Sequence, residues 1–306
     1  MLPSYADFGS GPVVAGGLHR TPLSGGVQSA TAKHDLPRPA VAVRNLMEQA
    51  RYAHLCTLMS RMHHRRAGYP FGSLVDFATE FTTGAPLLAL SPLAIHTRNA
   101  LADPRSNLVV QMPGWSGLAN ARVTVFGDLT QLTSPDDVSA AADAMALKHS
   151  PGSGVGGTWD DGGTRMMRLP SNFLYFRMSH VTDIYFVGGF GTVQWVDVAE
   201  YAAARPDAIC TRDGTTGTSP ERTLAALNAA FKRDVATRLL ASADEALLVS
   251  IDRTGVDCRV RRGGDVSVER LRFGSPVETP QQAHEALDIL LQAGGSGGPG
   301  AGVQAR

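Results

Sequence analysis

The sequence predicts an α+β fold in which a closed or two-layered β-structure precedes a smaller domain of α-β-β-β-α order. Residues 71–78 alternate along a strand with apolar side chains on both faces, and a Thr-Gly-Ala-Pro turn at 83–86 joins them to an apolar run at 87–90. A strand that is apolar on both faces is typical of closed or two-layered sheets. Between residues 219 and 293, a capped helix, three strands and a second capped helix follow one another.

The first domain is expected to cover residues 40–204, and hydrophobic periodicity together with capping residues predicts its elements. Helices are expected at 39–50, from Ser91-Pro92 onward, from Ser134-Pro135 to Lys148-His149, and at 197–204. Strands are expected at 54–60, 71–78, 87–90, 106–112 and 121–132, and paired strands within 173–187. The cationic turn at 61–67, RMHHRRA, is expected to be a solvated loop.

A linker at 205–218 and a small α+β domain at 219–293 complete the folded part. Its first helix places Leu224, Leu227, Phe231, Val235 and Leu239 on one apolar stripe. Strands are expected at 246–251, 256–261 and 266–273, and a capping box at 279–282 opens the last helix. Residues 1–39 are rich in Gly, Pro, Ser and Ala and contain only two acidic residues, so we expect a disordered tail that could be a transit-peptide remnant. Residues 294–306 are expected to be a flexible tail.

Composition excludes several classes of partner. The 28 basic and 28 acidic residues cancel, so no long-range field favours nucleic acid. No run of eighteen apolar residues occurs, and no membrane span is expected. Cys56, Cys210 and Cys258 are isolated in the sequence, which favours a reducing compartment over a disulfide framework.

Motifs exclude most common enzyme classes and leave cofactor chemistry. The sequence contains no nucleophile elbow, zinc signature or Walker loop. The run GSGVGG at 152–157 resembles a phosphate-binding loop, but it lacks the preceding strand, the following helix and any Gly-Lys-Ser/Thr. Redox or tetrapyrrole chemistry remains, in which the protein supplies shape, an axial ligand and cations.

Four side chains are candidates for such a site, each with a structural alternative. His96 and Arg98 start a predicted helix and suit an anion, or His96 packs the barrel. Arg122 lies in mid-strand and either meets an anionic ligand or faces solvent. His149 follows Lys148 at a helix end, where both basic groups complement the helix dipole, and only the family resemblance described below makes His149 a candidate.

Several motifs in the right order closely resemble the split-barrel flavin-binding superfamily of pyridoxamine 5′-phosphate oxidase. They are GYPFGS at 68–73, the residues Leu90-Ser91, His96-Thr97 and Asn99-Ala100-Leu101, DPR at 103–105, and YFVGGFG at 185–191. Within the superfamily they look most like the HugZ-type haem-degrading branch and its plastid homologues. The resemblance covers roughly Val43 to Gln292. It implies a split β-barrel (FMN-binding-like), a homodimer with a ligand cleft between barrel and partner subunit, and a chloroplast stromal or cytoplasmic location.

The resemblance implies haem, or another tetrapyrrole, as ligand and oxygen-dependent haem breakdown as activity. Contacts would come from His96, Arg98, Arg122 and His149, with His96 or His149 on the iron. One alternative is an FMN-dependent oxidoreductase whose phosphate is held by Arg98, Thr97 and Ser73. Another is a non-enzymatic regulator that contacts a tetrapyrrole-synthesis enzyme.

The second domain departs from the family pattern at one place. There the family commonly carries Met-Asn-x-Asp-His, whose histidine is a candidate iron ligand. This chain keeps Asn228 but has Ala230 and Phe231 in place of the acid and the histidine. Phe231 instead continues the apolar stripe of its helix.

Overall fold

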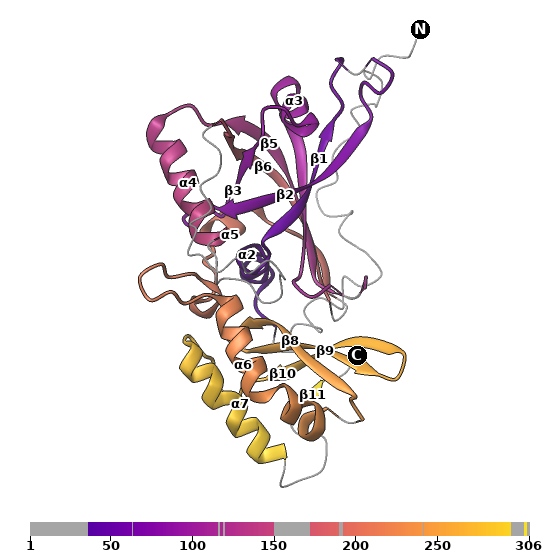
Figure 1. Cartoon of the computed structure of the whole chain (residues 1–306), viewed down its shortest axis with the longest axis vertical. Helices are drawn as coiled ribbons and strands as arrows, with labels where there is room; N and C mark the ends of the chain where they lie inside the picture. Colours follow the sequence, from indigo (N-terminus) through magenta and orange to yellow (C-terminus); the bar gives the residue numbers. More distant parts are fainter. Residues whose placement is uncertain are drawn as a thin grey trace, which may run out of the picture.

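The computed structural model describes residues 36–62, 64–115, 117–118, 120–149, 172–189, 192–240, 242–294 and 303–304. The molecule is elongated, with a β-barrel at one end and a smaller α/β domain at the other (Figure 1). The predicted N-terminal tail lies almost entirely outside the described residues, as does nearly all of the predicted C-terminal one. Among the described residues, no helix combines the length and apolar character needed to cross a membrane.

Six antiparallel strands close the barrel, which confirms the predicted α+β split-barrel fold. They run in the order β3-β2-β1-β4-β5-β6, β3 pairs again with β6, and a further strand, β7, extends the sheet beyond β6. Their bounds are β1 (Tyr52–Leu58), β2 (Pro70–Thr79), β3 (Pro86–Leu90), β4 (Arg105–Gln111), β5 (Arg122–Gln131), β6 (Leu174–Gly189) and β7 (Thr192–Val196).

Side chains fill the inside of the barrel. Leu55, Phe77, Leu88, Leu108 and Met178 are fully buried there, within one continuous core. A barrel of this size leaves little room once bulky residues point inward. A ligand site therefore belongs on the outside of the barrel or at its junction with another element.

The long strand β6 corrects the sequence prediction of paired strands at 173–187. It is a single 16-residue strand that pairs with β5 along most of its length, with β3 near its start and with β7 near its end. Register shifts after Phe126 and Asp128 bend the β5–β6 ladder. At this bend, a Cβ on Gly127 would lie 2.4 Å from the carbonyl oxygen of His180, so only glycine fits.

In the part of the chain that the structure describes, four helices surround the barrel: α2 (Pro39–Gln49), α3 (Ile95–Ala102), α4 (Pro135–His149) and α5 (Val198–Ala203). Helix α3 lies at the end away from the second domain, and α2 lies at the junction (Figure 1). The expectation that α3 opens at Ser91-Pro92 is wrong by three residues, because the N-cap is Ala94 and the first helical residue is Ile95. The Ala94 N–H donates to the carbonyl of Ser91 at 3.0 Å and Ala94 is extended, so a separate turn precedes the helix.

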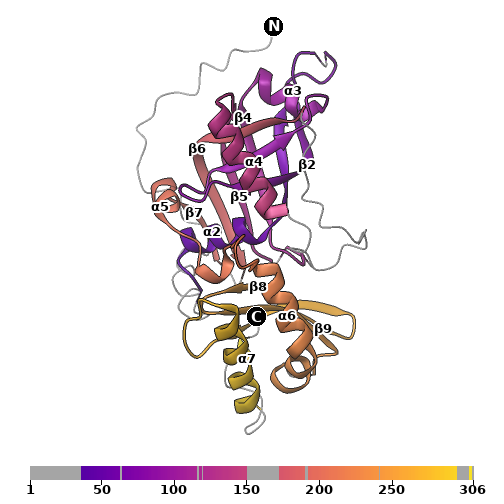
Figure 2. The ribbon, with the colours of Figure 1, turned by 60° about the vertical axis from the view of Figure 1, so that its left-hand side comes forward.

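The second domain is a small sheet with two helices packed on one face (Figure 2). Strands β8 (Glu245–Asp252), β9 (Gly255–Arg262) and β10 (Asp265–Arg272) form an antiparallel meander, and β11 (Val303–Gln304) pairs with β10. Helix α6 (Pro220–Asp234) continues into a π-helical turn, η2 (Val235–Leu239), and α7 (Pro280–Gly294) closes the domain. The predicted stripe is buried: Leu224, Leu227, Phe231, Val235 and Leu239 all lie in this core.

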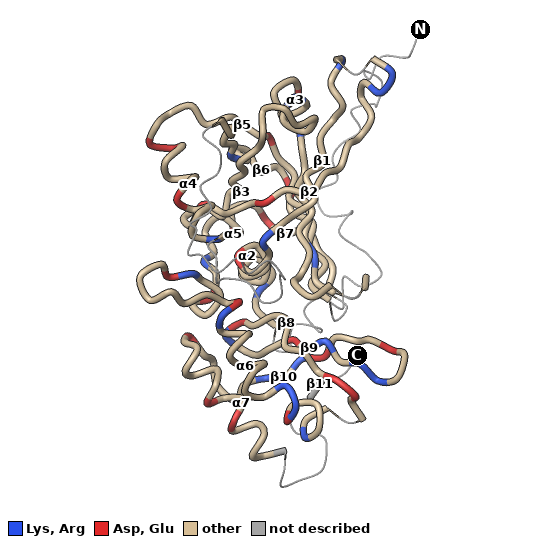
Figure 3. Tube along the Cα trace, in the orientation of Figure 1, with Lys and Arg blue, Asp and Glu red and all other residues tan. Residues whose placement is uncertain are grey.

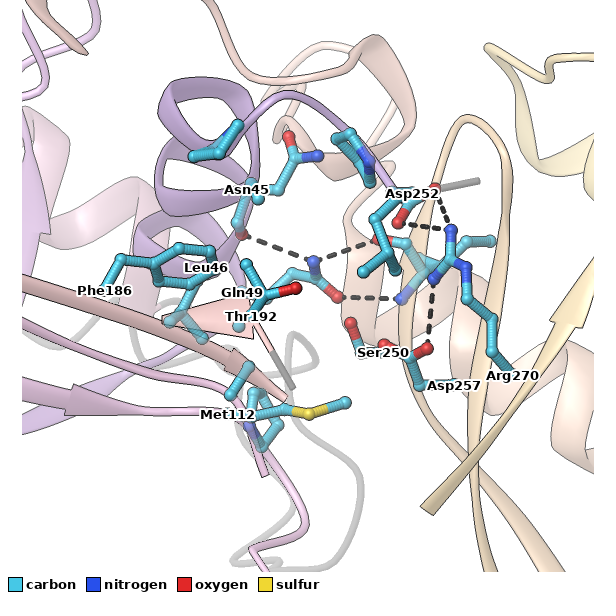
Figure 4. Close-up of a pocket in the computed structure, with 18 residues that line it drawn as sticks. Asn45, Leu46, Gln49, Met112, Phe186, Thr192, Ser250, Asp252, Asp257 and Arg270 are labelled. Atoms are coloured by element: carbon cyan, nitrogen blue, oxygen red, sulfur yellow. Dashed lines mark hydrogen bonds and ion pairs between the residues drawn. The ribbon is translucent and has the colours of Figure 1, made fainter. Parts of the chain in front are cut away.

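Two amide side chains of α2 join the barrel to the rest of the chain. Gln49 donates to the carbonyl of Ile251 and accepts from its N–H, both at 3.0 Å (Figure 4). Its side-chain amide thus pairs with the edge of β8 in the way that the backbone of a neighbouring strand pairs. Asn45 exchanges hydrogen bonds of 2.8 Å with Asp207, which follows α5 and precedes the short 3₁₀ helix η1 (Ala208–Cys210). Close by, Arg270 donates to Asp252 and Asp257 beside a cavity of about 60 Å³, enough for a few waters.

Candidate functional site

A cleft of about 640 Å³ lies between the barrel and the second domain, and we call it the interdomain cleft. Pockets of this size accommodate cofactors. The barrel contributes the start of β1, the end of α4 and the hairpin after β4, and the second domain contributes α6 and β8. The lining residues are Gln49, Ala50, Arg51, Tyr52, His54, Asp76, Gln111, Met112, Pro113, Gly114, Trp115, His149, Glu221, Leu224, Asn228, Leu247, Leu248 and Val249.

The second-domain wall is held in place by Asn228. Its amide donates to the carbonyl of Leu248 and accepts from the Leu248 N–H, both at 2.9 Å. This pair of bonds fixes α6 against β8, so the asparagine retained from the family motif is a structural residue here.

His149 enters the cleft as a neutral imidazole with a fixed orientation. It is 8% exposed, and its Nε2 lies 3.0 Å from the carbonyl oxygen of Phe77. A carbonyl only accepts, so Nε2 carries the proton and Nδ1 keeps a lone pair. Burial lowers the pKa of His149 to about 4, so the ring stays neutral near pH 7. An imidazole oriented through its other nitrogen is the usual arrangement of a metal-ligating histidine.

Lys148, the preceding residue, turns away from the cleft. Its Nζ donates to the carbonyl of Met47 at 2.6 Å and lies 3.8 Å from the centre of the Phe77 ring. Burial lowers the pKa of Lys148 to about 7. It lines a separate cavity of about 350 Å³ with Glu48 and Arg212, and Arg212 pairs with both Glu48 and Glu221. The end of α4 is therefore a wall between two cavities.

The cleft also offers a cation and aromatic surface. Arg51 is half-buried, and its guanidinium makes no hydrogen bond or ion pair to a described residue. Tyr52 is 66% exposed, Trp115 is half-buried, and His54 is exposed on the same face of β1 as Tyr52. Asp76 and Glu221 bring negative charge, but Glu221 is paired with Arg212. A planar apolar ligand that carries carboxylates would find aromatic faces, a guanidinium and an imidazole here.

His96 and Arg98 lie elsewhere, at the α3 end of the barrel. His96 Nδ1 is 2.9 Å from the hydroxyl of Ser73, and burial lowers the pKa of the ring. None of the three cavities described above includes His96 or Arg98. The contact with Ser73 matches the structural alternative, in which His96 packs the barrel.

Arg122 bends back over its own hairpin. Its Nη1 donates to the carbonyl of Leu118 at 2.6 Å, and Arg122 is absent from the lining of the interdomain cleft. Of the four predicted site residues, the structure thus brings His149 alone into this cleft.

Phe231 is 8% exposed and packs in the core of the second domain, where its ring centre lies 4.5 Å from that of His284. A histidine at this position would be surrounded by core residues.

Sequence reasoning missed Arg51, Tyr52, His54 and Trp115. Tyr52 and His54 alternate with the buried Ala53 and Leu55, which signals an outward face of β1 but does not say what covers it. The second domain defines the site, and its placement depends on contacts such as that between Gln49 and Ile251, which are 202 residues apart in sequence.

Comparison with known proteins adds to this geometry. A family model described as CREG, beta-barrel, matches residues 34–203. The chloroplast haem oxygenase HOZ of Arabidopsis thaliana is 32% identical over 155 residues, which is 51% of this chain and 44% of that protein. The chain thus matches less than half the length of that relative.

Solved structures are also similar to this chain. A haem-binding protein from Mycobacterium smegmatis is 25% identical, with a TM-score of 0.48 over 86% of this chain and 99% of that one. The haem storage protein HutZ from Vibrio cholerae is 16% identical, with a TM-score of 0.36 over 49% of this chain and 95% of that one.

Proposed function

The chain belongs to the CREG β-barrel family of split-barrel proteins, and we propose that it binds haem, or another tetrapyrrole, in the interdomain cleft. One observation carries this proposal: the cleft combines a neutral, oriented imidazole with a guanidinium that has no partner among the described residues. The sequence relationship to a chloroplast haem oxygenase supports the same ligand class.

The residues present fit a haem group. His149 offers Nδ1 to iron while Phe77 holds the ring through Nε2. Arg51 suits a propionate, and Tyr52 and Trp115 give faces for the macrocycle. Bound haem would supply the redox and oxygen chemistry, whereas the chain orients the group and limits its contact with water. Oxygen-dependent haem breakdown is part of this proposal.

Titration of the purified chain with haemin tests the binding. We expect a saturable shift of the Soret band, and Tyr52→Ala should weaken the affinity by a factor of about 2 to 10, as expected for loss of one aromatic contact. Phe81→Ala is the matched control, because Phe81 is 60% exposed and lies outside the cleft. A chain that shows no saturable shift, or that purifies with a flavin spectrum, contradicts the proposal. Addition of an electron donor in air to the loaded protein then tests for breakdown, read as loss of the Soret band.

Homodimer formation and a plastid location are proposed as well. Leu74 and Trp195 lie outside the cleft lining and are 65% and 45% exposed on the barrel, apolar side chains that a second copy could cover. The interdomain cleft itself is lined by one chain, whereas the resemblance implied closure by a partner subunit. Light scattering of the purified chain tests the dimer. Import into isolated chloroplasts, comparing the full chain with one that starts at Leu36, tests the location.

A further inference from the structure

The β1–β2 hairpin carries a cluster of positive charge at the barrel end opposite the second domain. Every described residue from Arg61 to Pro70 is exposed, including Arg61, His64, Arg65 and Arg66. The sequence contains no acidic residue between Arg51 and Val75. The chain as a whole has a formal net charge of zero, so this concentration is a local feature.

The hairpin holds these side chains away from the body of the molecule. Its base is closed by two backbone hydrogen bonds, Met59 N–H to Tyr69 O at 2.9 Å and Gly68 N–H to Met59 O at 2.8 Å. Figures 1 and 3 show the loop projecting beyond the barrel with basic residues at its end. The guanidinium groups of Arg61, Arg65 and Arg66 make no hydrogen bond or ion pair to any described residue. Their charge is therefore free for an external partner.

Large apolar side chains are exposed at the same end. Met62 is 74% exposed and Tyr69 is 67% exposed within the hairpin itself. Helix α3 is tied to the base of the hairpin, because Asn99 Oδ1 accepts from Ser60 N–H at 2.9 Å and its Nδ2 donates to Thr57 at 3.1 Å.

The solvent side of α3 continues this apolar surface. Ile95 and Leu101 are 37% and 55% exposed, with Arg98 between them at helical spacing, and Leu93 just before the helix is 75% exposed. Arg98 has no side-chain partner among the described residues. Arg98 does not line the interdomain cleft, and its guanidinium adds to the positive charge at this end of the barrel.

We propose that this barrel end, the hairpin at 61–69 with the outer side of α3, docks on the surface of an anionic lipid bilayer. Arginine side chains attract anionic headgroups, and tyrosine, methionine and leucine enter the interfacial region beside them. Nucleic acid would use the cations, and a base could stack on Tyr69, but it would leave the aliphatic side chains of Met62, Leu93, Ile95 and Leu101 exposed to water. An acidic protein surface is the other macromolecular partner, and the experiment separates it.

Docking in this way fixes the orientation of the molecule. The second domain lies at the far end of the long axis and would face the aqueous phase (Figure 1). The inference does not depend on what the cleft binds.

Co-sedimentation of the full chain with vesicles tests the proposal. We expect binding to phosphatidylcholine vesicles that contain an anionic phospholipid, little binding to pure phosphatidylcholine, and release by salt. Arg61→Gln, Arg65→Gln and Arg66→Gln together should weaken partitioning about 100-fold, because each arginine near the surface contributes about fivefold. Met62→Ser with Tyr69→Ser should weaken it as well while leaving the charge unchanged.

The matched control removes the same charge from the second domain. Arg233, Arg238 and Arg253 are exposed there, and their joint replacement by Gln should leave vesicle binding near the wild-type level. Absence of binding to anionic vesicles overturns the proposal and leaves an acidic protein as the partner. Equal losses of vesicle binding in the two triple variants also overturn it, because they would show that binding depends on the net charge of the chain and not on this barrel end.

Discussion

His149 and Lys148 are adjacent in the chain, and burial lowers the pKa of each. The lowered pKa values affect the stability of the protein in different pH ranges. Burial lowers the pKa of His149 from 6.5 to about 4 and that of Lys148 from 10.5 to about 7. In both cases the folded state binds fewer protons than the unfolded state between the two values, so the free energy of unfolding falls as pH falls through that window.

The His149 window leads to a stability prediction. The change from 6.5 to about 4 corresponds to roughly 3 kcal/mol of stability lost between pH 6.5 and 4. His149→Gln keeps a donor for the Phe77 carbonyl but cannot titrate. Urea unfolding at about pH 7 and about pH 4.5 should therefore show a smaller loss in the variant than in the wild type. Equal losses in the two proteins would mean that His149 takes up its proton over the same pH range in the folded and unfolded states, so that burial does not lower its pKa.

Gly84 lies where both the backbone conformation and two neighbouring side chains require a glycine. It has φ +76°, and an added Cβ would lie 2.6 Å from Arg44 Nη1 and 2.7 Å from the Tyr201 hydroxyl. Arg44 is fully buried and donates to the carbonyl of Phe81 at 2.6 Å, and Tyr201 donates to the carbonyl of Gly84 at 2.7 Å. Neither neighbour can move freely.

Gly84→Ala should therefore destabilise the protein through both backbone strain and crowding, by about 2–4 kcal/mol. Gly263→Ala is the control, since Gly263 has φ +60° and an added Cβ there would meet nothing within 4 Å. Its cost should be about 1–2 kcal/mol, from the backbone alone. If Gly84→Ala and Gly263→Ala lose the same stability in thermal unfolding, contact with Arg44 and Tyr201 does not contribute to the cost at Gly84.

At the scale of elements, the contact between α2 and β8 positions the cleft. Gln49→Ala would leave the buried N–H of Ile251 without its acceptor, while the carbonyl of Ile251 keeps the Cys210 thiol at 3.1 Å. We expect a loss of about 1–3 kcal/mol in unfolding free energy. Gln281→Ala, which removes only an exposed bond to Glu285, should cost less than about 0.5 kcal/mol. If the two variants unfold alike, the α2–β8 amide pair does not stabilise the junction.

Helix α6 gives a prediction about the replaced family histidine. Phe231 is buried and its ring contacts the exposed His284, so Phe231→His places an imidazole among the core residues of the second domain. Truncation of a buried Phe costs about 3–5 kcal/mol, and the polar replacement should approach that value without tightening haem binding. A stable Phe231→His variant with higher haem affinity would show that this face of α6 reaches the ligand.

Capping residues and hydrophobic periodicity predicted most helices and strands. The strand predictions that were wrong depend on pairing between residues far apart in the sequence. Thr279 and Gln282 form the expected capping box, with reciprocal bonds of 3.2 Å. Strand β6 was divided in error because its pairing changes from β3 to β7 along its length, which local periodicity does not reveal. The sequence shows apolar residues on both faces of β2, and one of them, Leu74, is 65% exposed in the single chain.

At the scale of the whole molecule, the sequence predicted the fold and only part of the candidate site. The motifs near Ser91 and His96 identify the superfamily, but in this chain they lie at the barrel end away from the interdomain cleft. His149 was singled out because Lys148 and His149 resemble a basic-His pair of the family at this helix end. Its neighbours in the cleft come from β1, the β4–β5 hairpin and the second domain, which only tertiary packing brings together.

The most direct test of the account is the haemin affinity of single histidine variants, followed by the Soret band. If His149 is the iron ligand as we propose, His149→Gln should weaken haemin binding at least tenfold and change the ferric spectrum, in a variant that keeps the bond to Phe77. His96→Ala and the exposed control His180→Ala should match the wild type. A wild-type affinity and spectrum in His149→Gln, with the loss appearing in His96→Ala, would contradict the account and place the ligand at the α3 end of the barrel.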